Sequence, residues 1–449
     1  MKIFIKTYGC QMNERDSEAA AAMFSVRGHE VVDHESLADV LIFNTCSVRD
    51  QAERKAVGKI GFMKKLKKER PDLIIGVMGC MAQNRGEELF KELPHLDFVL
   101  GTGQLHKLAD IVDSIRDDRR AQVALLEPGD EVLTGLGAHY NNSIFASIAI
   151  TRGCNRYCSY CIVPYVRGRE ISRSIADIVD EARELVADGT REIMLLGQNV
   201  AAFGLGGNIN PPPPDHSPLA DLLNELCAID GLKRIRFTSP YPSYFNDRLI
   251  DAIAAQPKIC RSIHLPLQSG SDRVLKAMNR HYTAGQYLEI VDKLRAEIPD
   301  IAFSTDIIVG FPGETDEDFN ATREMMNRVG YDMAYIFKYS PRQGTVAAKL
   351  EDDIPQEVKE ERNQILLSDL EKRTAETNRK LLGSTQEILV EGVSKRNAER
   401  WSGKTSTAKT VIFTPGPDTA VGELAMVRIN RVTAVSLFGE LQPAPLRGN

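Results

Sequence analysis

The most constraining feature of this sequence is a run of three cysteines within eight residues, Cys154, Cys158 and Cys161. The run follows directly after a predicted strand, and five further predicted strands alternate with helical segments after it. Such alternation favours a parallel sheet, and six units favour a partial (β/α)6 barrel with its chemistry at the carboxyl ends of the strands. The six strands are predicted at Phe145–Thr151, Glu192–Leu196, Arg234–Thr238, Ser262–Leu265, Ala302–Val309 and Ala334–Tyr339.

A second set of three cysteines lies in the first 118 residues, where predicted strands and helices also alternate. Cys10, Cys46 and Cys80 each come just after a predicted strand. Parallel strands end at one edge of their sheet, where ligands bind, so these distant cysteines are expected to converge. The strands are predicted at Ile3–Tyr8, Val40–Asn44, Ile74–Met78 and Phe98–Gly101, with helices that include Glu14–Val26 and Gln51–Lys68.

The rest of the chain completes a predicted three-domain α/β organisation. Residues 119–139 are charged and then contain glycine, which is typical of a linker. The proline-containing segment Gly204–Pro218 is expected to be an inserted loop, either a lid or a passive surface loop. A charged helix over Glu357–Leu382 leads to short β-rich segments that favour a small antiparallel β-barrel. The predicted domains are 1–118, 140–372 and 375–441, and the last has strands at Gln386–Glu391, Thr410–Phe413, Leu424–Ile429 and Ala434–Leu437.

The composition favours a cytoplasmic protein with cofactor-binding cysteines. The chain has 449 residues, 43% of them hydrophobic, and a net charge of −6. Its start does not resemble a signal peptide, and no apolar stretch is long enough to span a membrane. Eight cysteines in such a chain argue against a disulfide framework. The isolated Cys227 and Cys260 are expected to be buried structural residues.

Two local concentrations of basic residues are candidate RNA contacts. Nine basic and three acidic residues between positions 49 and 70 give one predicted helix a charge of +6. Clustered lysines suit a phosphate backbone, although a plain solvated helix face explains this run equally well. Trp401 lies among basic residues of the last domain, where it could stack on a base or serve as a structural residue. The candidates in these regions are Lys64, Lys65, Lys395, Arg396 and Trp401.

Three closely spaced thiolates on one loop suit an iron–sulfur cluster. Cys154, Cys158 and Cys161 can bind three irons of a cubane and leave the fourth iron open to a substrate or cofactor. A structural zinc site is the alternative, but such sites use four nitrogen or sulfur ligands, often in CxxC pairs. The pattern therefore favours a catalytic cluster.

The string RGCNRYCSYCIVPYVRGRE resembles the CxxxCxxC loop of the radical S-adenosylmethionine (SAM) superfamily. The upstream cysteines and the small C-terminal β domain are similar to the methylthiotransferase family, in which that β domain is called TRAM. The resemblance extends over residues 1–441. The strings TYGCQMN, NTCSVR, MGCMAQ and LLGQNV are most similar to members that make 2-methylthio-N6-isopentenyladenosine in tRNA, and Gln11-Met12-Asn13 distinguishes them from members that modify a ribosomal protein.

The resemblance implies a tRNA-modifying transferase. Its reaction would convert N6-isopentenyl(dimethylallyl)adenosine at position 37, next to the anticodon, to the 2-methylthio form, with one SAM as methyl donor and one as radical source. Implied partners are tRNA, a flavodoxin- or ferredoxin-like electron donor and iron–sulfur assembly or carrier proteins, and the protein is expected to be a monomer. Two [4Fe–4S] clusters are implied, an auxiliary one on Cys10, Cys46 and Cys80 and one that binds SAM on Cys154, Cys158 and Cys161.

Residues at the predicted strand ends are candidate SAM contacts, with packing at a strand end as the alternative for each. Arg152, Arg167 and Arg169 flank the cluster loop and suit either the SAM carboxylate or an RNA phosphate, because guanidinium binds both in bidentate fashion. The candidates for SAM binding are Gly197, Gln198, His264, Gln268, Ser269, Asp306, Gly310 and Phe311.

Two departures from the family pattern concern substrate contacts rather than cluster ligands. Ala201 stands where the family commonly has Asn, and Tyr241 stands where it commonly has His. Three other functions remain open at this point. They are a methylthiotransferase for threonylcarbamoyladenosine in tRNA, a non-catalytic RNA-binding protein with structural zinc, and an iron–sulfur electron carrier.

Overall fold

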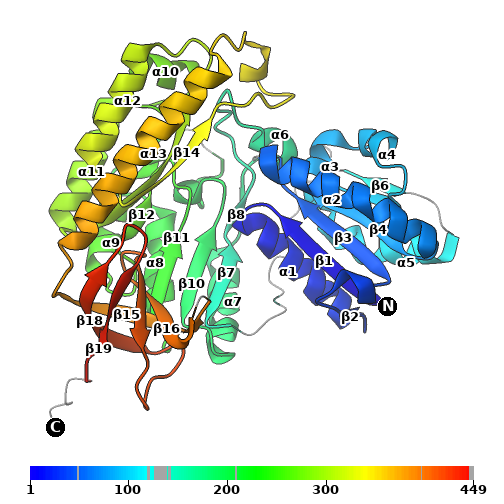
Figure 1. The fold of residues 1–449 in the computed structure, drawn as a ribbon, viewed down its shortest axis with the longest axis horizontal. Helices are drawn as coiled ribbons and strands as arrows, with labels where there is room; N and C mark the ends of the chain where they lie inside the picture. Colours follow the sequence, from blue (N-terminus) through cyan, green and yellow to red (C-terminus); the bar gives the residue numbers. More distant parts are fainter. Residues whose placement is uncertain are drawn as a thin grey trace.

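The computed structural model describes residues 1–47, 50–118, 122–125, 139, 143–207, 210–395 and 397–443. Figure 1 shows an α/β domain at the right, a larger α/β domain at the centre and left, and a small β domain below the larger one. The first domain faces the larger one along the side that carries α6 (Val163–Arg167) and β8 (Thr151–Arg152). This is the α/β architecture that the sequence predicts.

The first domain is a parallel sheet in the order β2-β1-β3-β4-β5-β6. The sheet continues beyond residue 118, because β6 pairs in parallel with β5 and places Gln122 opposite Phe98. The segment expected to be a linker therefore contains a strand of the first domain, which the sequence did not reveal because the strand is short and lies among charged residues. The strands are β1 (Lys2–Tyr8), β2 (Glu30–Val31), β3 (Val40–Thr45), β4 (Ile74–Gly79), β5 (Phe98–Leu100) and β6 (Gln122–Ala124).

Helices cover both faces of this sheet and bury two separate apolar clusters. Phe24 and Ile115 pack on one face, and Ile60 and Met81 pack on the other. Every residue of β3 and β4 is buried, as expected for central strands with helices on both sides. The helical elements are α1 (Gln11–Val26), η1 (Glu35–Leu37), α2 (Asp50–Glu69), α3 (Cys80–Arg85), α4 (Glu88–Glu92), η2 (Thr102–Lys107) and α5 (Leu108–Asp118).

The larger domain is a partial barrel of parallel strands, as predicted. Two adjoining sheets have the orders β7-β10-β11 and β12-β13-β14, and Ile235 of β11 bridges to Ile259 just before β12. The strands are β7 (Phe145–Ala149), β10 (Glu192–Leu196), β11 (Arg234–Phe237), β12 (Ser262–His264), β13 (Ala302–Val309) and β14 (Met333–Lys338), with β8 and β9 (Ile171–Ser172) forming a small hairpin beside them.

Helices enclose the outside of this barrel. Along β13, Phe303, Thr305 and Ile307 are buried against the helices, whereas Ser304 and Asp306 alternate with them and stay partly accessible inside the barrel. The helical elements are α7 (Ile175–Ala187), η3 (Val200–Ala202), α8 (Pro218–Cys227), η4 (Pro242–Tyr244), α9 (Asp247–Ala255), α10 (Asp272–Ala277), α11 (Ala284–Glu297), α12 (Asp316–Val329), η5 (Ala347–Lys349) and α13 (Gln356–Arg379).

The third domain is a closed barrel in the order β15-β16-β17-β19-β18. All its pairs are antiparallel except β17–β19, which is parallel. The predicted strand at Ala434–Leu437 is displaced, and β16 escaped prediction because its first half is polar and exposed. The strands are β15 (Thr385–Ser394), β16 (Asn397–Thr405), β17 (Thr410–Thr414), β18 (Leu424–Val432) and β19 (Leu437–Leu441).

The third domain is docked on the amino-terminal ends of the large-barrel strands. Arg236 of β11 donates a 2.8 Å hydrogen bond to the carbonyl of Thr405 and another to the carbonyl of Ser406. Arg234, the first residue of β11, binds the carbonyl of Lys404. The small barrel therefore lies at the end of the large barrel opposite the carboxyl ends of its strands, as Figure 1 shows.

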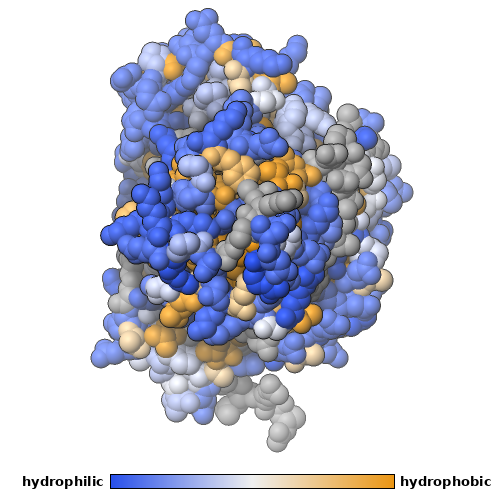
Figure 2. Space-filling view, turned by 90° about the vertical axis from the view of Figure 1, so that its right-hand side faces the viewer, coloured by the Kyte–Doolittle hydropathy of each residue, from blue (hydrophilic) through white to orange (hydrophobic). Residues whose placement is uncertain are grey.

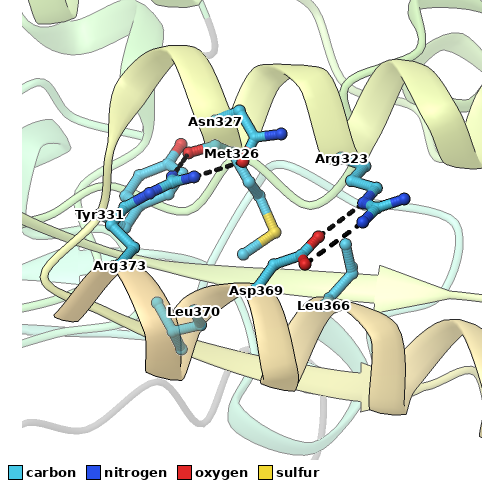
Figure 3. Close-up of a pocket in the computed structure, with 8 residues that line it drawn as sticks. All are labelled: Arg323, Met326, Asn327, Tyr331, Leu366, Asp369, Leu370 and Arg373. Carbon is cyan, nitrogen blue, oxygen red and sulfur yellow. Dashed lines mark hydrogen bonds and ion pairs between the residues drawn. The ribbon is translucent and has the colours of Figure 1, made fainter. Parts of the chain in front are cut away.

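Helix α13 runs along the outside of the barrel and carries the chain to the third domain. Arg323 of α12 binds both carboxylate oxygens of Asp369, and Arg373 binds the side chain of Asn327, as Figure 3 shows. These contacts bridge the shallow pocket between α12 and α13. Within the described residues, no helix is long and apolar enough to cross a membrane. Seen from the first domain's side, the surface is mostly hydrophilic, with apolar side chains gathered near its middle (Figure 2).

Candidate active site

The cysteines of the first trio, Cys10, Cys46 and Cys80, follow the ends of three adjacent strands. The register pairs Tyr8 with Thr45 and Thr45 with Gly79, so β1, β3 and β4 end level with one another. The thiol of Cys46 donates a hydrogen bond that lowers the pKa of Cys10 to about 5, against the opposing effect of burial. The predicted convergence of these cysteines at one sheet edge is therefore what the structure contains.

Asparagine side chains hold the backbone around this trio. Asn13 accepts a hydrogen bond from the Cys10 thiol at 3.2 Å and donates one to the Asn44 side chain at 2.8 Å. Gly79 has a φ of +97°, and a β-carbon there would lie 2.4 Å from Asn44 Oδ1. Only glycine fits this conformation and this space before Cys80.

The second trio lies on the loop after β8, at the carboxyl end of the barrel. Gly153 has a φ of +78°, and a β-carbon there would lie 2.0 Å from the carbonyl oxygen of Arg169. Gln198 accepts a 2.6 Å hydrogen bond from the backbone of Gly153. At the other end of the loop, Ser159 binds the carbonyl oxygens of Ala277 and Met278. The loop is thus fixed at both ends, as a rigid ligand set requires.

Burial makes two thiols of the second trio, Cys154 and Cys161, weaker acids. It raises the pKa of Cys154 to about 12 and raises that of Cys161 as well, and neighbouring thiols of the trio add to both shifts. A cationic metal group would reverse this cost because it stabilises thiolates directly.

The two trios approach each other across the interface between the domains. Met12, near Cys10, packs with Ala149 and Leu196 at the ends of β7 and β10. Cys80 itself packs with Ile162 and Val166 on and before α6, directly after the second trio. The sheet edge that carries Cys10, Cys46 and Cys80 therefore lies over the mouth of the barrel.

A buried carboxylate locks this interface. Asp16 of α1 binds Arg152, and it accepts a second hydrogen bond from Arg167 at 3.1 Å. Arg152 also donates to the carbonyl of Thr102 at 2.5 Å. Arg152 and Arg167 are 6% and 4% exposed, because both are buried between the two domains. In this structure both arginines link the domains, and contact of either with RNA stays a prediction.

The surroundings of the first trio fit an anionic sulfur-rich group. Arg167 Nη1 is buried without a hydrogen-bond partner among the described residues, and Cys80 and Cys10 are close enough to favour its charged form. In the described part of the chain, no three His, Cys, Asp or Glu side chains could share one metal ion. A cubane distributes its ligands over separate irons, so this spacing does not conflict with a cluster.

The candidate SAM contacts divide into two groups. His264 and Asp306 lie 3.3 Å apart inside the barrel, with Gln198 and Gly197 beside the cluster loop. Ser269 is fully buried and bonded to Thr322 of α12, and the Phe311 side chain packs in a separate apolar cluster. The side chains of Ser269 and Phe311 are therefore packed behind the strand ends, and SAM contact at these two residues stays a prediction.

The two remaining candidates in this group, Gln268 and Gly310, are held in place through their backbones. Gln268 has a φ of +71° and bonds through its backbone to Asp306 and Ile308 of β13. Gly310 has a φ of +69°, and a β-carbon there would lie 2.3 Å from Lys359. SAM contact at Gln268 and Gly310 stays a prediction.

The candidate RNA contacts outside the domain interface differ in exposure and packing. Lys64 and Lys65 are exposed on α2, whereas Lys59 and Lys67 of the same run pair with Glu35 and Asp97. Arg169 and Lys395 are exposed, and Arg396 lies outside the described residues. Trp401 is half-buried and packs against the core of the third domain, as its structural interpretation predicts.

Some residues near the cluster loop were not singled out from the sequence. Arg156 and Arg280 lie on opposite sides of Tyr241, with their guanidinium carbons 3.9 Å and 4.3 Å from its ring centroid. Tyr157 and Tyr165 are exposed and form an edge-to-face pair at 5.9 Å. The departure from the family pattern at Tyr241 was the only feature of the sequence that pointed to the group of Arg156, Tyr241 and Arg280.

Comparison with known proteins adds the family. Residues 2–101 match the uncharacterized protein family UPF0004, residues 148–326 match the radical SAM superfamily, and residues 379–442 match the TRAM domain. The tRNA-2-methylthio-N(6)-dimethylallyladenosine synthase of Opitutus terrae is 46% identical, over 99% of this chain and 98% of that protein. The chain belongs to the tRNA-2-methylthio-N(6)-dimethylallyladenosine synthase family. The synthase of Clostridium beijerinckii is 43% identical, over 98% of this chain and 95% of that protein.

Solved structures agree on the fold. The radical SAM methyltransferase TsrM from Kitasatospora setae matches with a TM-score of 0.56 and 16% identity, over 77% of each chain. The cobalamin-dependent radical SAM enzyme OxsB matches with a TM-score of 0.51 and 13% identity, over 83% of this chain and 56% of that one. As a member of the synthase family, this chain is a radical SAM enzyme, with SAM and [4Fe–4S] clusters as its cofactors.

Proposed function

We propose that this protein is a tRNA methylthiotransferase that converts N6-isopentenyl(dimethylallyl)adenosine at position 37 to its 2-methylthio derivative. The observation that carries the proposal is the meeting of two cysteine trios at one domain interface, where Cys80 packs against Ile162 and Val166 of the second trio's segment. One trio alone accounts for radical generation. A second trio beside it accounts for a sulfur donor.

The six cysteines are the proposed cluster ligands. When bound, the clusters and SAM supply the radical, the methyl group and the sulfur. This chemistry suits carbon 2 of adenine, because that carbon has no acidic hydrogen for a general base to remove. The auxiliary cluster is assigned to Cys10, Cys46 and Cys80, and the SAM-binding cluster to Cys154, Cys158 and Cys161.

The chain's own residues bind and orient these groups. Gln198 fixes the start of the cluster loop through the backbone of Gly153, and the His264–Asp306 pair offers polar atoms inside the barrel to SAM. Asp16 holds the two domains together through Arg152 and Arg167. These contacts hold the reacting centres in a fixed arrangement, which is the main contribution of a protein to cofactor chemistry.

Several exposed groups suit an RNA substrate. Lys64, Lys65 and Arg169 offer positive charge to phosphates, and the pair of Tyr157 and Tyr165 beside the cluster loop offers rings for base stacking. The third domain lies at the opposite end of the barrel from this loop. A ligand that contacts both regions must be large, which favours a folded tRNA over a free nucleoside.

The proposal is tested with the triple variant Cys10→Ala/Cys46→Ala/Cys80→Ala. Supplied with SAM and dithionite, it should still form 5′-deoxyadenosine but should convert no isopentenyladenosine in tRNA, as measured by mass spectrometry of the digested tRNA. Formation of the methylthio product by this variant would refute the assignment of the auxiliary cluster.

The matched control is Cys227→Ala/Cys260→Ala, since both cysteines are buried outside the two trios. It should retain both the product and about eight irons per chain, the content of two [4Fe–4S] clusters. The competing substrate is tested by supplying tRNA with threonylcarbamoyladenosine instead, and preferential conversion of that tRNA would overturn the isopentenyl assignment.

The remaining assignments complete the proposal. The functional units are residues 1–118 with β6 attached, a radical SAM core at 140–372 and an RNA-binding TRAM domain at 375–441. The enzyme works as a cytoplasmic monomer. It takes electrons from a flavodoxin- or ferredoxin-like donor and receives its clusters from iron–sulfur assembly or carrier proteins.

A further inference from the structure

Tyr241 is enclosed between two positively charged side chains next to the second cysteine trio. The guanidinium of Arg156 lies 3.9 Å from the ring centroid, and that of Arg280 lies 4.3 Å from it. The three residues come from distant parts of the chain: the cluster loop, the segment after β11 and the segment after α10. Arg156, Tyr241 and Arg280 are 6%, 4% and 9% exposed. We call these three residues the cation stack.

Arg280 is anchored so that one nitrogen reaches a cluster ligand. Its Nε donates to the hydroxyl of Tyr282 at 2.9 Å, and its Nη2 donates to the carbonyl of Pro266 at 2.9 Å. Its Nη1 lies 3.6 Å from Cys158 Sγ and donates a hydrogen bond to it. Because the other nitrogens are occupied, the guanidinium cannot swing away from Cys158.

Arg156 brings a second positive charge to the same loop. It lies two residues after Cys154, and its Nη1 contacts the hydroxyl of Tyr244 at 3.4 Å. Tyr244 also lies 6.0 Å from Tyr241, edge to face, so the aromatic rings hold both arginines in place. Rings can carry cations on both faces because each face has negative electrostatic potential.

Two buried arginines on one tyrosine are costly, since their charges repel and are removed from water. An anionic group beside them offsets that cost. A [4Fe–4S]2+ core with three thiolates carries a charge of −1, and uptake of one electron from an external donor changes it to −2. Positive charge and an N–H···S hydrogen bond near the ligands favour the more negative form.

We propose that the cation stack of Arg156, Tyr241 and Arg280 raises the reduction potential of the cluster on Cys154, Cys158 and Cys161. Arg280 is a positioning residue in this role, because it acts through the Cys158 sulfur. The stack makes the first electron transfer easier for a donor of modest reducing power. The inference concerns the cluster alone and holds whichever RNA is the substrate.

The test is a redox titration of the full-length, cluster-loaded protein, followed by electron paramagnetic resonance without tRNA. The titration is carried out in the Cys10→Ala/Cys46→Ala/Cys80→Ala background, in which only the cluster on Cys154, Cys158 and Cys161 can give a signal. Arg280→Gln should lower the ratio of reduced to oxidised cluster about tenfold at a fixed potential, which for one electron corresponds to a shift of about 59 mV. Arg280→Lys keeps the charge and should recover most of that shift.

Two further variants keep the test decisive. Arg156→Gln should also lower the potential, and it serves in place of Arg280→Gln if that variant does not load iron. Arg295→Gln is the matched control, because Arg295 packs on the ring of Phe303 near the opposite end of the barrel. Unchanged potentials in the loaded Arg280→Gln and Arg156→Gln variants, or an equal shift in Arg295→Gln, would overturn the proposal.

Discussion

Asp16 on the first helix accepts a 3.1 Å hydrogen bond from Arg167, which lies 151 residues later in the chain. The carboxylate also binds Arg152, and all three side chains are at most 7% exposed. Helix α1 begins directly after Cys10, and α6 begins two residues after Cys161. This ion pair therefore joins the segments that carry the two cysteine trios.

Replacing Asp16 by Asn should separate radical formation from sulfur insertion. The change leaves two buried guanidiniums without their anion, which costs about 3 kcal/mol of unfolding free energy. We expect a lower melting temperature, persistent 5′-deoxyadenosine and at least tenfold less methylthio product. Asp180→Asn breaks an exposed pair with Arg183 and should change none of these quantities. Normal product formation by Asp16→Asn would contradict a positioning role for the interface.

Replacing Gly153 by Ala should prevent loading of the SAM-binding cluster. The new methyl group would collide with the carbonyl of Arg169 in a backbone conformation that already disfavours side chains. The measurement is the iron content after reconstitution, which should fall by about half. Gly189→Ala has a similar positive φ but open space around it, so it tests backbone strain alone. Equal iron loss in both variants would show that collision is not the cause.

Glu170 should make stability depend on pH. Burial raises the pKa of its carboxyl from 4.5 to about 8, against the opposing charge of Arg156. Between these values the folded chain keeps a proton that the unfolded chain loses, so this group's contribution to stability falls as pH rises. Glu170→Gln should therefore gain stability relative to the native chain from pH 5 to pH 9, measured by urea unfolding of cluster-free protein. The exposed Asn320→Ala control changes no titratable group and should show a constant difference.

Replacing Lys64 and Lys65 by Ala should weaken tRNA binding through electrostatics. The slope of log affinity against log salt is negative, and each lost phosphate contact makes it shallower by about 0.9, so the slope of the double variant should be shallower by about 2. The measurement is binding at several salt concentrations. Lys276→Ala/Lys293→Ala removes equal charge from α10 and α11, and it should leave the slope unchanged. Equal slopes for the native and Lys64/Lys65 proteins would exclude α2 from the RNA interface.

Local patterns predicted the strands and the cysteine trios well. The limits of β10 and β13 agree with the prediction residue by residue, because apolar runs and turn residues bound these strands locally. Prediction failed for β16, since its residues Asn397–Arg400 are exposed and mostly polar, and pairing with β15 makes them part of a strand. It also failed for β6, which is three residues long and depends on β5 for its hydrogen bonds.

The functional residues show the same difference between what local sequence determines and what depends on long-range contacts. The spacing of Cys154, Cys158 and Cys161 lies within one loop, so the sequence alone determined that these thiols could share one group. The sequence alone also predicted that the strands before Cys10 and Cys46 end at one edge of the sheet. The burial of Arg152 and Arg167 and their pairing with Asp16 depend on how the first domain packs on the barrel, which places Asp16 between them. Burial and charge pairing depend on contacts more than a hundred residues apart, and no local pattern encodes those contacts.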